Sequence, residues 1–215
     1  MLNYGICILC LRMIECSLNQ TPRGNCRRFE QSCTNGSQHS GISGYYLEDI
    51  MEDNTIQVIY GEGKGKTSAA IGQSIQAISA GKRVVFIRFL KGRNLNDYTC
   101  IERLEPDMKV FCFEKEDELY ENLEPDRQEE EKQNMVNGFH FANKVVETGE
   151  CDLLVLDEVL GLLDIGVLTI QDLYRLIERC GSDVSLIMTG KYVPKELIQH
   201  IDIVSEIKQI KQLKS

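Results

Sequence analysis

Residues 56–90 read IQVIYGEGKGKTSAAIGQSIQAISAGKRVVFIRFL, and the class of the fold can be predicted from them. Its first five residues are apolar, largely β-branched and followed by glycine, which predicts a short buried strand. From Thr67 onward the apolar spacing predicts a helix that ends near Gly81, and residues 83–90 predict a second strand. The apolar face of that helix is expected to carry Ile71, Ile75 and Ile78. A strand, a glycine-rich loop and a helix in this order favour an α/β protein.

The glycine-rich loop has the composition of a phosphate-binding loop. Glycines let backbone N–H groups converge on an anion, and the start of the following helix adds a partial positive charge. Lys66 can neutralise phosphate, and the Thr67 hydroxyl can ligate Mg²⁺. Tyr60 stands where the general motif G-x-x-x-x-G-K-[ST] has glycine, so the form here, G-x-x-x-G-K-T, is one residue shorter. An incidental glycine turn is disfavoured by the strand and helix around it. The candidate nucleotide-binding residues are Gly61, Glu62, Gly63, Lys64, Gly65, Lys66 and Thr67.

A second polar element follows a strongly apolar run at residues 152–156. Asp157 and Glu158 end this run about 90 residues after the loop, where magnesium-binding carboxylates are commonly found. The alternative is a strand that simply enters a polar turn. After the next apolar run, residues 189–191 (Thr-Gly-Lys) fit a phosphate contact and a plain turn equally well. The candidate catalytic residues are Lys66, Thr67 and Glu158, and the candidate metal ligands are Thr67, Asp157 and Glu158.

The rest of the chain alternates in the same way. Further strands are predicted at residues 108–113, 152–156, 184–188 and 202–207, with a helix at 126–148. Thr169 and Asp172 predict a capping box for another helix, and Pro194 is expected at the first position of a short one. Continuous apolar strands between amphipathic helices favour a mostly parallel sheet covered on both faces.

Charge and hydropathy exclude some classes of protein. The 24 Lys and Arg against 33 Asp and Glu give a net charge of −9, which disfavours general nucleic-acid binding. No stretch approaches the roughly 18 apolar residues that a membrane span needs. Residues 114–132 hold ten acids and three bases, and this charge fits two interpretations. One is a solvated, mobile surface segment, and the other is a lid or specificity loop beside the active site.

The first 50 residues differ from the remainder. They contain five of the nine cysteines, but Cys7 and Cys10 have no second pair at zinc spacing. We expect a disordered or non-native extension at 1–50 and one domain at 51–215, with Met51 as the natural start. Codons for residues 47–50 can spell a ribosome-binding GGAGG before that methionine; the alternative is a genuine flexible arm. The four scattered cysteines favour buried, reduced thiols in a cytoplasmic protein: Cys100, Cys112, Cys151 and Cys180.

Several of these stretches resemble the P-loop type of ATP:cob(I)alamin (corrinoid) adenosyltransferases. The hallmark of that family, G-[NED]-G-K-G-K-T-[TS]-A-A, corresponds to residues 61–70. Its F-[IL]-K-G motif is matched by residues 89–92, and its later motifs by LLVLDEV, MTGK and IDIVSEIK. The resemblance covers about residues 55–209 and implies a RecA-like P-loop NTPase fold.

The resemblance also implies a reaction, which is transfer of the 5′-deoxyadenosyl group of ATP to Co(I) of a reduced corrinoid with release of triphosphate. It implies a nucleotide bound in reverse of ordinary P-loop ATPases, phosphates on residues 61–67, and Mg²⁺ on Thr67 and Glu158. A flavoprotein reductant and a homodimer are expectations of the same kind. The chain has no tryptophan, although known members carry a Phe-x-Trp pair that displaces the lower axial ligand of the corrinoid. The bulky candidates in that stretch are Phe113, Leu119 and Tyr120. The alternative functions are a generic P-loop ATPase or kinase and a non-catalytic nucleotide- or corrinoid-binding module.

Overall fold

The computed structural model describes residues 54–92, 101–181 and 183–211. The predicted N-terminal extension and Cys100 lie outside these residues. The elements, in chain order, are β1 (Ile56–Tyr60), α2 (Lys66–Ser79), β2 (Val84–Arg88), the 3-10 helix η2 (Ile101–Leu104), β3 (Met108–Cys112), the 3-10 helix η3 (Tyr120–Asn122), α3 (Pro125–Thr148), β4 (Leu153–Asp157), α4 (Gly161–Asp164), α5 (Ile170–Cys180), β5 (Ser185–Gly190), α6 (Lys195–Ile198) and β6 (Ile203–Glu206).

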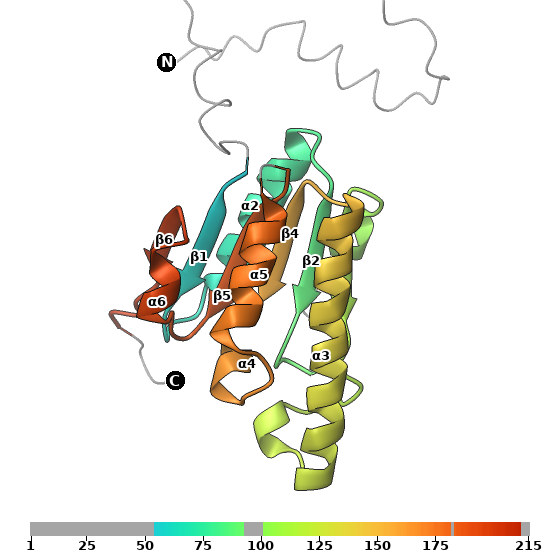
Figure 1. The fold of residues 1–215 in the computed structure, drawn as a ribbon, viewed down its shortest axis with the longest axis vertical. Helices are drawn as coiled ribbons and strands as arrows, with labels where there is room; N and C mark the ends of the chain where they lie inside the picture. The colour runs from blue at the N-terminus through green and yellow to red at the C-terminus, as the bar shows by residue number, and fades with distance from the viewer. Residues whose placement is uncertain (1–53, 93–100, 182, 212–215) are drawn as a thin grey trace, which may run out of the picture. The chain divides into compact units, whose positions relative to one another are not determined.

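The six strands form one sheet in the order β3-β2-β4-β5-β1-β6, and every pair is parallel (Figure 1). The predicted α/β fold with a parallel sheet is therefore confirmed. β5 separates the loop strand β1 from the acidic strand β4, and β2 borders β4 on its other side. Because the strands are parallel, their carboxyl ends meet at one edge of the sheet, where ligands of such folds bind.

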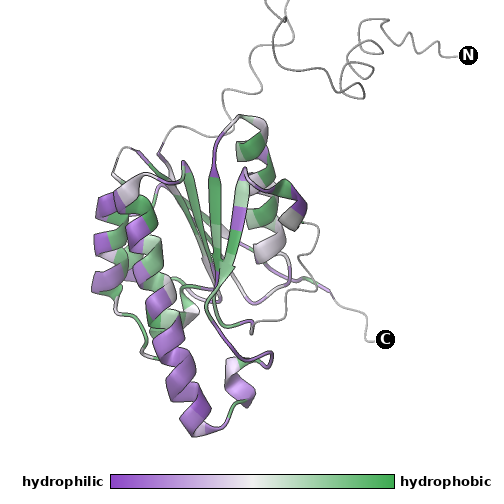
Figure 2. Cartoon of the chain, turned by 90° about the vertical axis from the view of Figure 1, so that its right-hand side faces the viewer, coloured by the Kyte–Doolittle hydropathy of each residue, from purple (hydrophilic) through white to green (hydrophobic). Residues whose placement is uncertain are grey.

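Helices cover both faces of this sheet. α2 packs on one face, and α3 and α5 pack on the other (Figure 2). The sequence of β4 is apolar up to its last residue because successive side chains of a strand point to opposite faces, and both faces of this strand are buried. Leu154 and Leu156 join the core beneath α3 and α5, whereas Leu153 and Val155 join the core beneath α2. Among the described residues, no helix combines the length and the apolar character needed to cross a bilayer.

The face that α2 buries differs from the expected one. Ala70, Ser74 and Ala77 are fully buried, whereas Ile75 is 46% exposed. Ile71 and Ile78 are only partly buried at the edge of the contact. Small side chains let the helix axis lie close to the sheet, so they occupy the centre of the contact in place of the isoleucines. The prediction for this face was wrong at Ile75 for that reason.

Two helix starts were also predicted. The capping box of α5 is confirmed, because the Thr169 hydroxyl accepts the backbone N–H of Asp172 and the Asp172 carboxylate accepts the backbone N–H of Thr169. Pro194 lies one position earlier than expected, as the N-cap of α6 in an extended conformation. Proline has no N–H to donate, so either position leaves no donor unsatisfied.

The acidic stretch 114–132 divides between two structures. Its first part runs as a loop through η3, and its last residues form the first turns of α3. Most of its side chains face solvent, but Glu114 and Glu131 are only 5% and 2% exposed. Glu131 Oε1 accepts the backbone N–H groups of Lys115 and Glu116 at 2.9 and 3.2 Å. The interpretation as a solvated segment therefore fails for these two acids, and Glu131 ties the loop to α3.

Candidate nucleotide site

The loop after β1 takes its shape from glycines. Gly61 has φ +130°, and a Cβ there would lie 2.2 Å from the carbonyl oxygen of Ile207. Its N–H donates to the carbonyl oxygens of Gly190 and Lys191, both at 3.1 Å. Gly65, with φ +118°, is the N-cap residue of α2. These contacts bring the loop to the carboxyl ends of β1 and β5, with the helix start beside it.

Lys66 lies at the first position of α2 and is 8% exposed. Its Nζ donates to the carbonyl oxygens of Gly61 and Gly63 at 2.8 and 3.3 Å. The same atom lies 3.6 Å from Glu158 Oε1. The ammonium is thus already within the loop that was predicted to hold phosphate. The other charged loop residues, Glu62 and Lys64, are exposed.

Asp157 is the centre of the second predicted element. It ends β4 and is fully buried. The Thr67 hydroxyl lies 3.0 Å from both of its carboxylate oxygens, and the Thr189 hydroxyl donates to Oδ1 at 2.7 Å. Thr189 Oγ1 in turn accepts the N–H of Glu158 at 2.8 Å. Threonines from α2 and β5 therefore fix the carboxylate that β4 delivers.

The structure separates the two predicted acids. Thr67 contacts Asp157, whereas Glu158 pairs with Lys66. Glu158 has φ +61°, so the chain turns away from the line of the strand directly after Asp157. The candidate metal ligands therefore divide into a Thr67–Asp157 pair and an acid that faces the loop lysine.

Lys91 completes this cluster, although the sequence had singled it out only within a motif. Its Nζ lies 2.5 Å from Asp157 Oδ2 and also contacts Thr67 Oγ1. The signal for it was the Phe-Leu-Lys-Gly stretch after β2. The local sequence does not reveal strand order, so the contact of this lysine with Asp157 follows only from the β2–β4 pairing.

The Thr67–Asp157 pair fits Mg²⁺, which prefers hard oxygen ligands. A hydroxyl and a carboxylate converge here, and the Lys91 ammonium between them stands in for a cation. Within the described part of the chain, no group of three or more His, Cys, Asp or Glu residues could hold a metal alone. Mg²⁺ at this position would therefore complete its shell with phosphate oxygens and water, as is usual at nucleotide sites.

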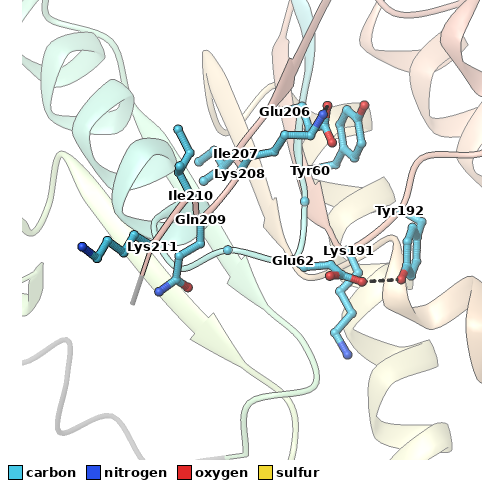
Figure 3. Close-up of a pocket in the computed structure, with 12 residues that line it drawn as sticks. Tyr60, Glu62, Lys191, Tyr192, Glu206, Ile207, Lys208, Gln209, Ile210 and Lys211 are labelled. Atoms are coloured by element: carbon cyan, nitrogen blue, oxygen red, sulfur yellow. Dashed lines mark hydrogen bonds and ion pairs between the residues drawn. The ribbon is translucent and has the colours of Figure 1, made fainter. Parts of the chain in front are cut away.

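Two cavities lie at the carboxyl ends of the strands, and the larger one borders the loop. The larger, about 700 Å³, lies between residues 60–63 and residues 206–211 (Figure 3). The Tyr192 hydroxyl donates to Glu62 Oε1 there at 2.8 Å, and this bond raises the pKa of Tyr192. The smaller cavity, about 250 Å³, is lined by Leu90, Lys91, Leu119, Tyr120, Glu121, Glu158, Gly161, Asp164, Ile165 and Lys191. Lys191, directly after β5, lines both cavities.

The smaller cavity brings the acidic segment to the site, because three residues of that segment line it. Glu114 anchors the start of the segment, since its Oε1 accepts the backbone N–H of Lys91 at 3.2 Å and its Oε2 accepts the Cys112 thiol at 3.2 Å. Burial raises the pKa of Cys112 to about 12, so the thiol keeps its proton and remains a donor. Burial also raises the pKa of Glu114. The position of the segment favours the lid or specificity interpretation over a plain surface loop.

The remaining described cysteines agree with the sequence-based expectation. Cys151 and Cys180 are free and buried, and burial raises the pKa of each thiol to about 12. Cys112 is also free but only partly buried.

A glycine loop of this form, closing on a parallel-sheet edge that carries Thr67 and Asp157, places the chain among P-loop nucleotide-binding proteins. Within that class, residues 52–214 match the family described as ATP:corrinoid adenosyltransferase BtuR/CobO/CobP. The chain belongs to this family.

Similar proteins agree at low identity. The corrinoid adenosyltransferase of Escherichia coli K12 is 25% identical over 162 residues, which cover 74% of this chain and 79% of that protein. Corrinoid adenosyltransferase CobA of Salmonella typhimurium is 25% identical over 178 residues, with the same coverage. An uncharacterized protein of Nostoc sp. is 27% identical over 165 residues, which cover 72% of this chain but only 44% of that protein. A solved structure of the replication initiator DnaA bound to AMPPCP and single-stranded DNA aligns at a TM-score of 0.39 and 18% identity, over 76% of this chain and 43% of that chain.

Proposed function

We propose that this protein transfers the 5′-deoxyadenosyl group of ATP to Co(I) of a reduced corrinoid and releases triphosphate. The observation that supports this most is the shortened loop of residues 61–67 beside Thr67 and the buried Asp157, in a chain of the corrinoid adenosyltransferase family. Formation of Co(I) requires an electron donor, for which we expect a flavoprotein. We also expect a cytoplasmic homodimer.

The reaction is a displacement at carbon. The lone pair of Co(I) attacks C5′ of the ribose, a Co–C bond forms, and the C5′–O bond breaks with its electron pair passing to the triphosphate oxygen. Because no proton is removed from the nucleophile, the reaction needs no general base. The protein must align cobalt, C5′ and the leaving oxygen, and must stabilise the charge on the triphosphate.

The residues at the sheet edge match these tasks. The N–H groups of residues 61–67 would bind phosphate oxygens, and Lys66 would exchange its loop carbonyls and Glu158 for phosphate. Thr67 and Asp157 would hold Mg²⁺, which when bound neutralises part of the polyphosphate charge. Thr189 would keep the Asp157 carboxylate in place through its hydroxyl.

The acidic segment is our candidate for the corrinoid side of the site. Leu119 is 50% exposed, and with Tyr120 it lines the cavity that contains Lys91 and Glu158. Phe113 instead packs against Phe141 with ring centroids 5.4 Å apart, so it belongs to the core. Leu119 and Tyr120 are therefore the better counterparts of the family's Phe-x-Trp pair.

One assay tests the proposal against its alternatives. The protein is incubated with Mg²⁺, ATP and a chemically reduced corrinoid, and the phosphorus product is identified by ³¹P NMR while the Co–C bond is followed by absorbance. We expect triphosphate and an adenosylated corrinoid in equal amounts. Orthophosphate would indicate a generic ATPase or kinase, and no turnover with intact binding would indicate a non-catalytic module.

A further inference from the structure

Lys91 occupies the place where the Thr67–Asp157 pair would hold a metal ion. Its Nζ lies 2.5 Å from Asp157 Oδ2 and contacts Thr67 Oγ1, so the hydroxyl and the carboxylate share one ammonium. Asp157 is fully buried, and a buried carboxylate without a positive partner is strongly unfavourable. Lys91 therefore supplies the charge that Asp157 needs when no metal is bound.

The backbone around Lys91 is fixed. Leu90 and Gly92 both have positive φ, +60° and +66°. A Cβ on Gly92 would lie 2.7 Å from the carbonyl oxygen of Asp117, and Glu114 accepts the Lys91 N–H at 3.2 Å. The side chain is less confined, because it is 23% exposed and lines the 250 Å³ cavity. The lysine is thus anchored at its Cα while its ammonium has space on one side.

We propose that Lys91 is a displaceable cation: its ammonium holds the metal position in the nucleotide-free protein and moves onto the polyphosphate when Mg²⁺ and ATP bind. Mg²⁺ coordinates oxygen at about 2.0–2.1 Å, so it cannot share Thr67 and Asp157 with an ammonium. Once Mg²⁺ occupies that position, the polyphosphate is the nearest anion that becomes available to the displaced Lys91 ammonium. Lys91 would join Lys66 there, and would stabilise the oxygen that receives the electron pair of the C5′–O bond. The role in the leaving-group step rests on the proposed function, whereas the exchange with metal does not.

A static ion pair is the competing explanation, and the two differ in their binding behaviour. If Lys91 competes with the metal, Lys91→Met removes the competitor and strengthens nucleotide-free metal binding. If Lys91 moves to phosphate, the same substitution weakens polyphosphate binding. If Lys91 is only a structural partner of Asp157, the substitution should change neither the metal affinity nor the polyphosphate affinity. If the substitution lets Asp157 lose its position, metal binding should become weaker.

The experiment compares Lys91→Met with Lys109→Met, since Lys109 is an exposed lysine on β3 away from the site. Mn²⁺ affinity without nucleotide is measured by electron paramagnetic resonance, and affinity for inorganic triphosphate with saturating Mg²⁺ by calorimetry. We expect Lys91→Met to bind Mn²⁺ about tenfold more tightly and triphosphate about tenfold more weakly, a change of about 1.4 kcal/mol in each. Lys109→Met should match the wild type in both. Unchanged or weakened Mn²⁺ binding in folded Lys91→Met would overturn the proposal.

Wild-type crystals provide the second measurement if Lys91→Met fails to fold. With Mg²⁺ and an unreactive ATP analogue bound, we expect the Lys91 ammonium on a phosphate oxygen, and an ammonium still bound to Asp157 would refute the exchange. Neither measurement contains a corrinoid. Release of orthophosphate in the corrinoid assay would therefore contradict the proposed function without affecting this proposal. The metal and triphosphate affinities would still test the role of Lys91.

Discussion

Asp157 shows how much of this site depends on single residues. Its carboxylate is fully buried and contacts two hydroxyls and one ammonium, from Thr67, Thr189 and Lys91. These groups come from α2, from β5 and from the loop after β2, and they satisfy a charge that burial alone would disfavour. A buried acid with this many partners is held in one position, which is what metal binding requires.

Substitution of Lys66 should reduce activity strongly while leaving the fold intact. Lys66→Ala removes the loop's buried positive charge, so we expect kcat/KM for adenosyl transfer to fall roughly 100-fold or more. The fold should persist, because the partners of this side chain among the described residues are loop carbonyls and Glu158 at the sheet edge. We expect the free energy of unfolding to change by less than about 2 kcal/mol. Corrinoid adenosylation and urea unfolding measure the two effects, and near-normal turnover would contradict the assignment of Lys66.

Glu114 should make the stability of the fold depend on pH. Burial raises the pKa of its carboxyl, and the nearby charge of Glu131 raises it further. A raised folded-state pKa means that this group stabilises the fold fully below its unfolded pKa, and that the contribution is lost as pH rises through the folded-state value. Glu114→Gln cannot ionise, so the stability of the variant relative to wild type should increase from pH 4 to pH 8. Urea unfolding across that range measures it, with exposed Glu129→Gln as the control. A difference that stays constant with pH would refute this cause.

At the scale of elements, the loop before α3 is tied to that helix by Glu131. Glu131 accepts two backbone N–H groups through Oε1, and its buried Oε2 has no hydrogen-bond partner among the described residues. The residue therefore contributes more to placing the segment than to the stability of the whole fold. The side chains of Leu119 and Tyr120 depend on that placement.

Glu131→Ala should release the segment. We expect chymotrypsin to cleave near Leu119 and Tyr120 about tenfold faster, since hydrogen bonds to buried N–H groups are each worth about 1–3 kcal/mol when they are removed. The KM for corrinoid should rise while ATP affinity stays near that of the wild type. Glu130→Ala is the matched control, because Glu130 lies on the same helix and forms an exposed ion pair with Lys115. Equal cleavage rates in the two variants would argue against the anchoring role.

At the scale of the molecule, we predict that residues 51–215 form the functional unit. The family match begins at residue 52, and the first described strand begins at Ile56. A chain that starts at Met51 should therefore keep the thermal unfolding midpoint within about 2 °C, a shift that corresponds to less than about 1 kcal/mol, because all the described strands and helices lie within the matched residues. Its kinetic constants should also equal those of the full sequence. Mass spectrometry of the natural protein offers a separate check, and peptides from before residue 51 would contradict the proposed start.

The six strands, four of the helices (α2, α3, α5 and α6) and the glycine loop could be predicted from the sequence, whereas η2, η3 and α4 were not predicted. Continuous apolar runs between amphipathic helices identified a parallel sheet, because strands buried on both faces cannot alternate with polar residues. The glycines, Lys66 and Thr67 identified the anion site, because few local sequences can wrap a backbone around phosphate. The acids after the run at 152–156 were found for a similar local reason, since they break an apolar pattern.

Only the tertiary structure decided which of these residues meet. The order β2-β4-β5-β1 puts Lys91 and Thr189 on Asp157 and turns Glu158 toward Lys66. It also buried small residues of α2 instead of Ile75, and it took Glu114 and Glu131 out of solvent within an acidic segment. Periodicity reports which side of an element is apolar, whereas strand order and burial depend on contacts between residues far apart in the chain. The displaceable lysine could therefore be inferred only after β2 and β4 were seen side by side.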